Sequence, residues 1–90
     1  MKYSVTIKNI SARVDKMTLP VSESVTITID AKDEFSARQK ATKHLFDGCS
    51  FVSEGSYGED GTQIGAIAYG GQRAKKLYGR IWVSQPVPHS

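Results

Sequence analysis

The amino-acid sequence predicts an α+β fold: an antiparallel β-sheet of about five strands with one α-helix packed on one face, in the order ββαβββ. Apolar and polar residues alternate along two segments of the first third of the chain. One amphipathic segment without glycine or proline follows, and glycines then divide the second half into short β-prone runs. The 90 residues contain no linker, so we expect a single domain over residues 1–90.

Residues 3–8 and 25–30 predict the first two strands, because apolar and polar side chains alternate along both. The second run is rich in β-branched residues, which favour a strand. After Asn9 the alternation resumes with the opposite parity, which predicts a bulge or bend near Asn9. Leu19-Pro20 then interrupts the pattern, since proline cannot donate a ladder hydrogen bond.

Residues 34–46 predict the helix, with Asp33 as the candidate N-cap and Gly48 as the stop. On a helical wheel the apolar residues fall on one arc, which holds Ala37, Ala41, Leu45, Phe35 and Phe46. Arg38 falls within this arc, so its guanidinium must reach the edge of the arc or pair with an acid.

Short segments fill the second half of the chain. In chain order we expect a strand opening at Phe51 and Val52, a loop or hairpin tip over Glu54–Gly61, a strand over Thr62–Tyr69, a turn at Gly70-Gly71 and a last strand over Leu77–Ser84. Pro86 and Pro88 end that strand, and we expect residues 85–90 to form a frayed tail.

The residue types disfavour an enzyme. His44, Asp47 and Cys49 lie close in sequence, but a histidine in the last turn of a helix is favoured there by the helix dipole. Cys49 follows a helix-stop glycine and is expected to be a small buried hydrophobe. Histidines, cysteines and clustered carboxylates are also too few for a metal site. We therefore expect no catalytic residue, no metal and no cofactor.

The apolar runs are too short for a membrane helix, which needs about 20 residues. The N-terminal segment MKYSVTIKNI has no apolar signal core, so we do not expect secretion. A single cysteine excludes an internal disulfide framework. These features favour an intracellular protein.

Twelve Lys and Arg residues against nine Asp and Glu residues give a net charge of +3, and the charges are unevenly distributed. Acidic residues gather around the expected first hairpin tip, at Asp47, Glu54, Glu59 and Asp60. Basic residues gather before and in the last strand, at Arg73, Lys75, Lys76 and Arg80. The sequence therefore predicts a bipolar molecule, although charges that merely keep a hairpin soluble explain the pattern equally well.

The last strand supplies the candidate contact surface. If Leu77, Ile81 and Val83 face the helix, then the aromatic and basic side chains between them share the outer face. The opposite parity would place Trp82 beneath the helix. Under the first alternative, the candidate partner-binding residues are Arg73, Lys75, Lys76, Tyr78, Arg80 and Trp82. A secondary basic face on and before the helix comprises Lys32, Lys40 and Lys43.

Three features together resemble small anti-CRISPR proteins that act on type I-F systems. They are the strand end Thr28-Ile29-Asp30-Ala31, the helix EFSARQKATKH over Glu34–His44, and the glycine-broken strands that end in Ile81-Trp82-Val83. The resemblance covers residues 25–84. It implies a phage-encoded, non-enzymatic inhibitor in the host cytoplasm, which docks on the crRNA-guided surveillance (Cascade/Csy) complex and blocks target-DNA binding.

Many such inhibitors are acidic mimics of duplex DNA, whereas this chain is basic. The resemblance therefore implies that the chain clamps a protein surface of the effector complex, or contacts guide RNA or DNA with its basic residues. The alternative hypothesis is a small basic nucleic-acid-binding accessory protein that uses the same surface.

Overall fold

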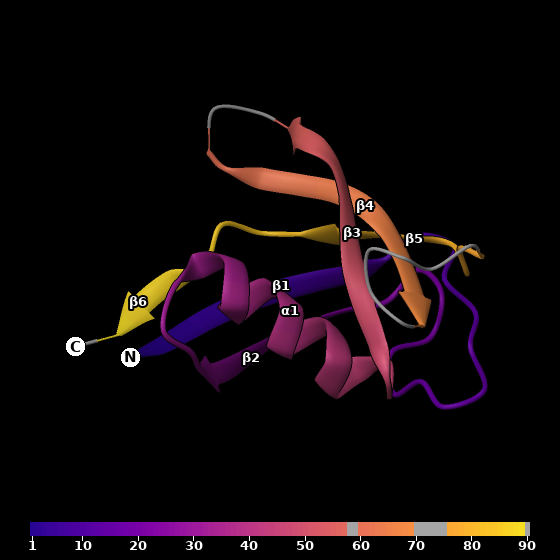
Figure 1. Ribbon diagram of the computed structural model, residues 1–90, viewed down its shortest axis with the longest axis horizontal. Coiled ribbons are helices and arrows are strands. Elements are labelled where there is room, and N and C mark those ends of the chain that lie inside the picture. The colour runs from indigo at the N-terminus through magenta and orange to yellow at the C-terminus, as the bar shows by residue number, and fades with distance from the viewer. Residues whose placement is uncertain (58–59, 70–75, 90) are drawn as a thin grey trace.

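The computed structural model describes residues 1–57, 60–69 and 76–89, which form one helix and a six-stranded antiparallel sheet (Figure 1). The elements are β1 (Lys2–Asn9), β2 (Ser24–Asp30), α1 (Glu34–Leu45), β3 (Cys49–Tyr57), β4 (Thr62–Tyr69), β5 (Arg80–Val83) and β6 (Val87–His89). The predicted α+β class, with one helix packed on an antiparallel sheet, is confirmed.

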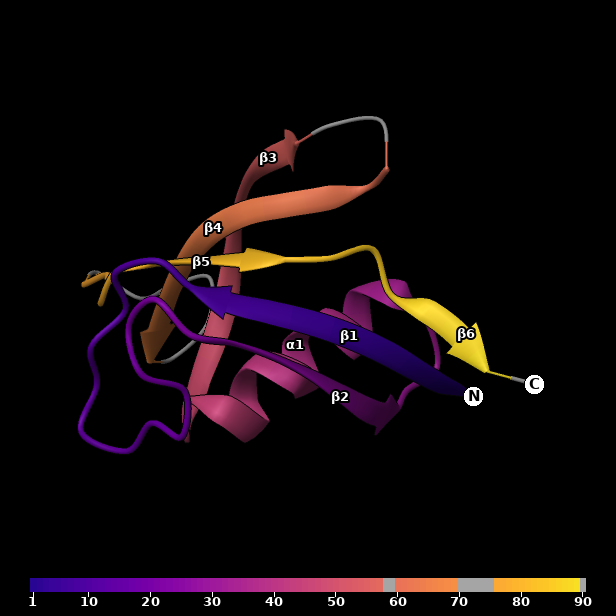
Figure 2. The ribbon, with the colours of Figure 1, turned by 180° about the vertical axis from the view of Figure 1, so that it is seen from behind.

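The strands are arranged in the order β2-β1-β5-β4-β3, and β6 also pairs with β1. The helix covers one face of this sheet, and Figure 2 shows β1 and β2 from the opposite side with α1 behind them. The core lies between α1 and the inner face, where the largest fully buried apolar side chains are Phe46, Ile7, Ile67, Ile81, Val5 and Val83. Among the described residues, no helix covers the outer face.

The C-terminal segment follows β1 along most of its length. β5 pairs with Ile7–Asn9 and β6 pairs with Lys2–Ser4, with a register shift of one residue between the two. Ser84 bridges the shift, because its hydroxyl accepts a hydrogen bond from the amide of Thr6 at 2.9 Å and its own amide donates to the Thr6 carbonyl at 2.9 Å.

The prediction of a frayed tail over 85–90 is therefore not met within residues 85–89. Pro86 is fully buried, and Val87–His89 form β6. Pro88 pairs with Tyr3. The backbone N–H and C=O groups of Thr6 point toward the C-terminal segment. Because these groups alternate in direction along a strand, those of Tyr3, three residues earlier, point away from this segment. The missing N–H of Pro88 thus removes no hydrogen bond to β1.

The helix begins as predicted, with Asp33 as N-cap. The Asp33 carboxylate accepts a hydrogen bond from the amide of Ser36 at 2.7 Å, and this bond lowers the pKa of Asp33. Phe35 differs from the helical-wheel prediction, because it is 62% exposed, whereas Phe46 is fully buried as the apolar arc predicts. Phe46 is the C-cap residue and has an extended backbone.

Two irregularities shape the strands. The predicted bulge near Asn9 is present, since the amides of Ile10 and Ser11 both donate to the carbonyl of Arg80 at 3.1 Å. The second bulge lies in β3 between Ser53 and Ser56, with Gly55 at φ +131°. It lets β3 continue to Tyr57, through part of the segment predicted as a loop.

Candidate binding surface on the outer face of the sheet

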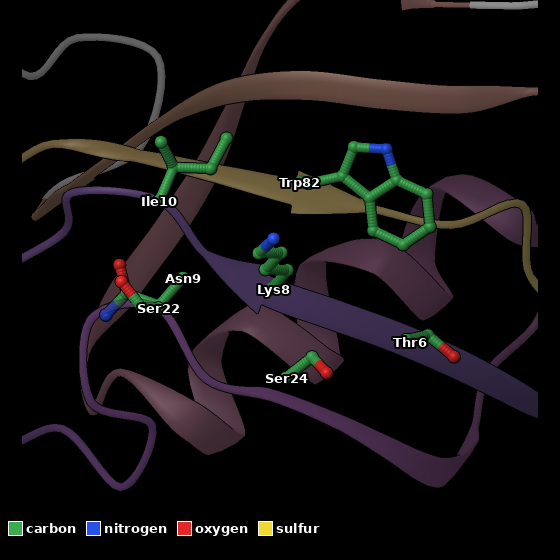
Figure 3. A pocket seen from close by; sticks show the side chains of 7 residues that line it. All are labelled: Thr6, Lys8, Asn9, Ile10, Ser22, Ser24 and Trp82. Atoms are coloured by element: carbon green, nitrogen blue, oxygen red, sulfur yellow. The ribbon is translucent and has the colours of Figure 1, made fainter.

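A groove of about 590 Å³ lies on the outer face of the sheet, on the side opposite α1 (Figure 3). It is lined by an aromatic residue, a cation, an aliphatic residue and four small polar residues: Trp82, Lys8, Ile10, Thr6, Asn9, Ser22 and Ser24. We call it the Trp82 groove. Figure 3 shows the indole of Trp82, the amine of Lys8 and the hydroxyls of Thr6 and Ser24 on the same side of the sheet.

Strand register brings these side chains together. Lys8 pairs with Trp82 across the β1–β5 ladder and with Ser24 across the β1–β2 ladder. Because successive side chains alternate between faces, Thr6 points outward with Lys8, and its hydroxyl lies 2.7 Å from that of Thr26. Three adjacent strands thus contribute to one polar surface with a single large aromatic side chain.

Hydrogen bonds of Asn9 fix the position of the segment between β1 and β2, which borders the groove. Its side-chain amide donates to the carbonyls of Ala12 at 2.9 Å and Leu19 at 2.8 Å, and its side-chain oxygen accepts from the amide of Ala12 at 2.7 Å. The backbone carbonyl of Asn9 accepts a further hydrogen bond from the amide of Ser22 at 2.8 Å. These bonds fix both ends of the segment between β1 and β2 that borders the groove.

The structure confirms that Ile81 and Val83 face the helix and that Trp82 lies on the outer face. Leu77 does not join the inward set, because it is 55% exposed and precedes β5. Tyr78 does not join Trp82 either. It packs against the core and against Tyr69, with ring centroids 5.1 Å apart.

Gly79 explains why the predicted stripe of Tyr78, Arg80 and Trp82 is divided. Its φ of +115° interrupts the strand conformation between Tyr78 and Arg80, so the two side chains do not follow simple alternation. A Cβ atom at Gly79 would lie 2.4 Å from the carbonyl oxygen of Ser11, which shows how closely the neighbouring segment approaches.

The basic residues predicted for this surface are only partly brought together. Arg73 and Lys75 lie outside the described residues. The Lys76 ammonium lies 5.2 Å from the centroid of the Tyr78 ring. Arg80 is exposed and pairs with Glu54 at 3.3 Å, so a predicted basic cluster and a predicted acidic cluster meet here. Of the four predicted basic residues, only Lys76 and Arg80 are described, and Arg80 is paired with an acid.

The secondary basic face is exposed as expected, with Lys32, Lys40 and Lys43 all in contact with solvent. The ammonium of Lys40 donates to the carbonyl of Asp30 at 2.9 Å, which ties the helix to the end of β2. This contact gives Lys40 a structural role. Among the described residues, no further hydrogen bond or ion pair brings the three lysines together.

His44 and Cys49 occupy different environments. His44 is exposed in the last turn of α1, whereas Cys49 is buried at the start of β3. Burial raises the pKa of the Cys49 thiol, which disfavours the thiolate that a nucleophile needs. No hydrogen bond joins the two side chains, so the geometry lacks the base–nucleophile contact of a catalytic pair.

Within residues 1–57, 60–69 and 76–89, no group of three His, Cys, Asp or Glu side chains is placed to hold a metal ion. In the same part of the chain, the helix is too short and too polar to cross a membrane. No protein-family model, curated protein or solved structure matches the chain. The resemblance to anti-CRISPR proteins therefore stays a prediction from the sequence.

Proposed function

We propose that this protein is a non-enzymatic binding module that contacts a macromolecular partner through the Trp82 groove. The observation that carries the proposal is a large indole that the core leaves partly exposed, in a groove on the face of the sheet opposite α1. Tryptophan is among the residues that most often dominate binding energy at protein interfaces, because it contributes a large rigid contact area. Lys8 and the surrounding hydroxyls supply the polar contacts that orient a partner.

For the partner, we propose the type I-F CRISPR surveillance complex of a bacterial host, with inhibition of target-DNA binding as the outcome. Support comes from the strand–helix–strand sequence over residues 25–84, which resembles the small inhibitors of these complexes. The partly exposed indole of Trp82 suits contact with a protein subunit, and the cation Lys8 beside it does not suit mimicry of DNA. On this proposal the protein acts in the host cytoplasm.

A second candidate function is binding of single-stranded nucleic acid. The observation that favours it is the pairing of Trp82 with Lys8 across neighbouring strands. A base can stack on the indole while the ammonium contacts a phosphate. Such binding would weaken steeply as salt increases, because phosphate contacts release counterions.

Replacing Trp82 with alanine tests the proposed surface. We expect Trp82→Ala to weaken partner binding at least about tenfold, as removal of a central interface aromatic commonly does. The measurement is the concentration of protein needed to block target-DNA binding by a purified type I-F surveillance complex. Leu77→Ala is the matched control, since Leu77 is an exposed apolar residue outside the groove.

The two candidate partners give different results. A gel shift of the protein alone on single-stranded DNA or RNA at physiological salt, lost in Trp82→Ala, would favour the nucleic-acid function. No shift, together with inhibition of the complex, would favour the inhibitor. Equal activity of Trp82→Ala and Leu77→Ala in both assays would exclude the Trp82 groove as the contact surface.

A further inference from the structure

A second cleft, of about 370 Å³, lies on the helix side of the sheet. Residues of α1, β3 and β4 line it, among them Phe35, Arg38, Gln39, Phe51 and Gln63. We call it the Arg38 cleft. None of these residues lines the Trp82 groove, so the two hollows are separate features of the fold.

Arg38 is a buried cation without a counter-charge among the described residues. Its side chain is only 8% exposed. Its Nη2 group donates to the carbonyl oxygen of Gly61 at 3.2 Å and to the side-chain oxygen of Gln85 at 2.9 Å, and both acceptors are neutral. Its Nε atom is buried and donates to no group in the described part of the chain.

This arrangement is energetically unusual. A buried charge is normally paired, because its transfer out of water is costly unless an opposite charge and hydrogen bonds compensate. The sequence pattern already required Arg38 to find an acid or to reach solvent. The described residues supply no acid, but Arg38 lines the cleft, so an anion that enters the cleft can supply the missing charge.

The walls of the cleft restrict the kind of anion. Phe35 is 62% exposed, and Phe51, which is buried, also lines the cleft. Both ends of the Gln39 side-chain amide are held by Phe51, since the amide donates to the carbonyl of Phe51 at 2.6 Å and accepts from its amide at 2.9 Å. The cleft thus combines the cation Arg38 with the aromatic residues Phe35 and Phe51 and with the held amide of Gln39. This combination suits a ligand in which an anionic group is joined to an apolar group.

We propose that the Arg38 cleft binds a carboxylate-bearing ligand, with the carboxylate accepting hydrogen bonds from Arg38 and an apolar portion packing on Phe35. The planar guanidinium forms its strongest contacts with carboxylates and phosphates. The carboxylate comes either from an acidic residue of a peptide or from a free carboxylic acid. This proposal does not rest on the proposed function of the Trp82 groove.

Thermal unfolding of the whole chain with added anions tests the proposal. We expect phenylacetate to raise the Tm in a saturable way, and acetate and inorganic phosphate at matched ionic strength to raise it less. A short peptide with adjacent Phe and Glu residues forms a second arm. Tighter binding of the peptide than of phenylacetate indicates a protein source, and the reverse order indicates a free acid.

Three variants connect the response to the cleft. Arg38→Gln is expected to abolish the phenylacetate response and Phe35→Ala to weaken it. Gln85→Glu places a carboxylate next to Arg38, so it is expected to raise the Tm by about 4–8 °C and to suppress the response. This variant keeps the test decisive if Arg38→Gln does not fold.

Several results would overturn the proposal. One is no saturable rise in Tm, and another is an equal rise with inorganic phosphate. A third is an unchanged response in both Arg38→Gln and Gln85→Glu. A fourth concerns Glu59, an acid close in sequence to Gly61 that lies outside the described residues. Destabilisation by Glu59→Gln as large as that by Arg38→Gln would mean that the chain supplies its own counter-charge.

Discussion

Asn9 is the residue whose side chain most directly shapes the candidate site, and the sequence pattern contains a signal for it. The inward positions of β1 are Tyr3, Val5, Ile7 and then Asn9, all of which are buried. A polar residue at an inward position must find hydrogen-bond partners. The pattern could therefore have marked Asn9 as a structural anchor, although it could not identify Ala12 and Leu19 as the partners.

We expect Asn9→Ala to destabilise the protein by about 2–4 kcal/mol, because it leaves buried backbone groups of Ala12 and Leu19 without partners. Urea unfolding followed by circular dichroism measures the loss. Ser24→Ala, an exposed change in the same groove, should stay within about 0.5 kcal/mol of the unchanged protein. A loss below about 1 kcal/mol for Asn9→Ala would contradict the anchoring role.

At the scale of the elements, the sequence predicts regular segments well and irregular ones poorly. The helix starts at the predicted residue, where Asp33 supplies the N-cap, and Thr62–Tyr69 coincide with β4, whose ends are marked by turn glycines. β5 is shorter than the predicted strand Leu77–Ser84, since Gly79 and the register shift near Ser84 interrupt it. A one-residue irregularity reverses the faces of all the residues beyond it, and alternation alone does not locate it.

The sequence predicts only part of the candidate site, because the same irregularities also affect the residues around the groove. The outward direction of Trp82 follows from alternation once Ile81 and Val83 are placed inside. The contributions of Ser22 and Ile10 depend on the segment between β1 and β2, which the sequence pattern does not place. The separation of Tyr78 from Trp82 depends on Gly79, whose positive φ serves a close backbone approach.

Two glycines with positive φ provide a matched test of that close approach. Both Gly79→Ala and Gly55→Ala force an alanine into an unfavourable backbone region, at a cost of about 1–3 kcal/mol. At Gly79 the new Cβ also meets the backbone of Ser11 at 2.4 Å, whereas at Gly55 it meets nothing within 4 Å. We expect Gly79→Ala to be the more destabilising by about 2 kcal/mol or more in urea unfolding. Equal losses would show that the segment at Ser11 moves away without cost.

At the scale of the whole molecule, the C-terminal segment is an integral part of the sheet. It supplies β5 and β6, the buried Pro86 and the Gln85 oxygen that accepts from Arg38. The bipolar charge pattern is also moderated at this scale, because folding brings Glu54 to Arg80. This exposed pair is worth only about 0–1 kcal/mol, so its main effect is on the surface potential rather than on stability.

Deletion of residues 85–90 distinguishes an integral segment from a frayed tail. We expect the shortened chain to lose about 2 kcal/mol or more, since β6, the buried proline and one partner of Arg38 are removed. Thermal and urea unfolding measure the loss, with deletion of Ser90 alone as the control. An unchanged Tm after deletion of residues 85–90 would mean that β6 contributes nothing to the fold.

The pairing of β1 with β6 has a practical consequence for how the protein can be handled. Lys2 pairs with His89, so the two ends of the chain lie side by side (Figures 1 and 2). Both lie at the opposite end of β1 from Lys8 and Asn9, which line the Trp82 groove. A tether attached beside Lys2 or beside His89 would hold the molecule at the same end of β1, away from Lys8 and Asn9.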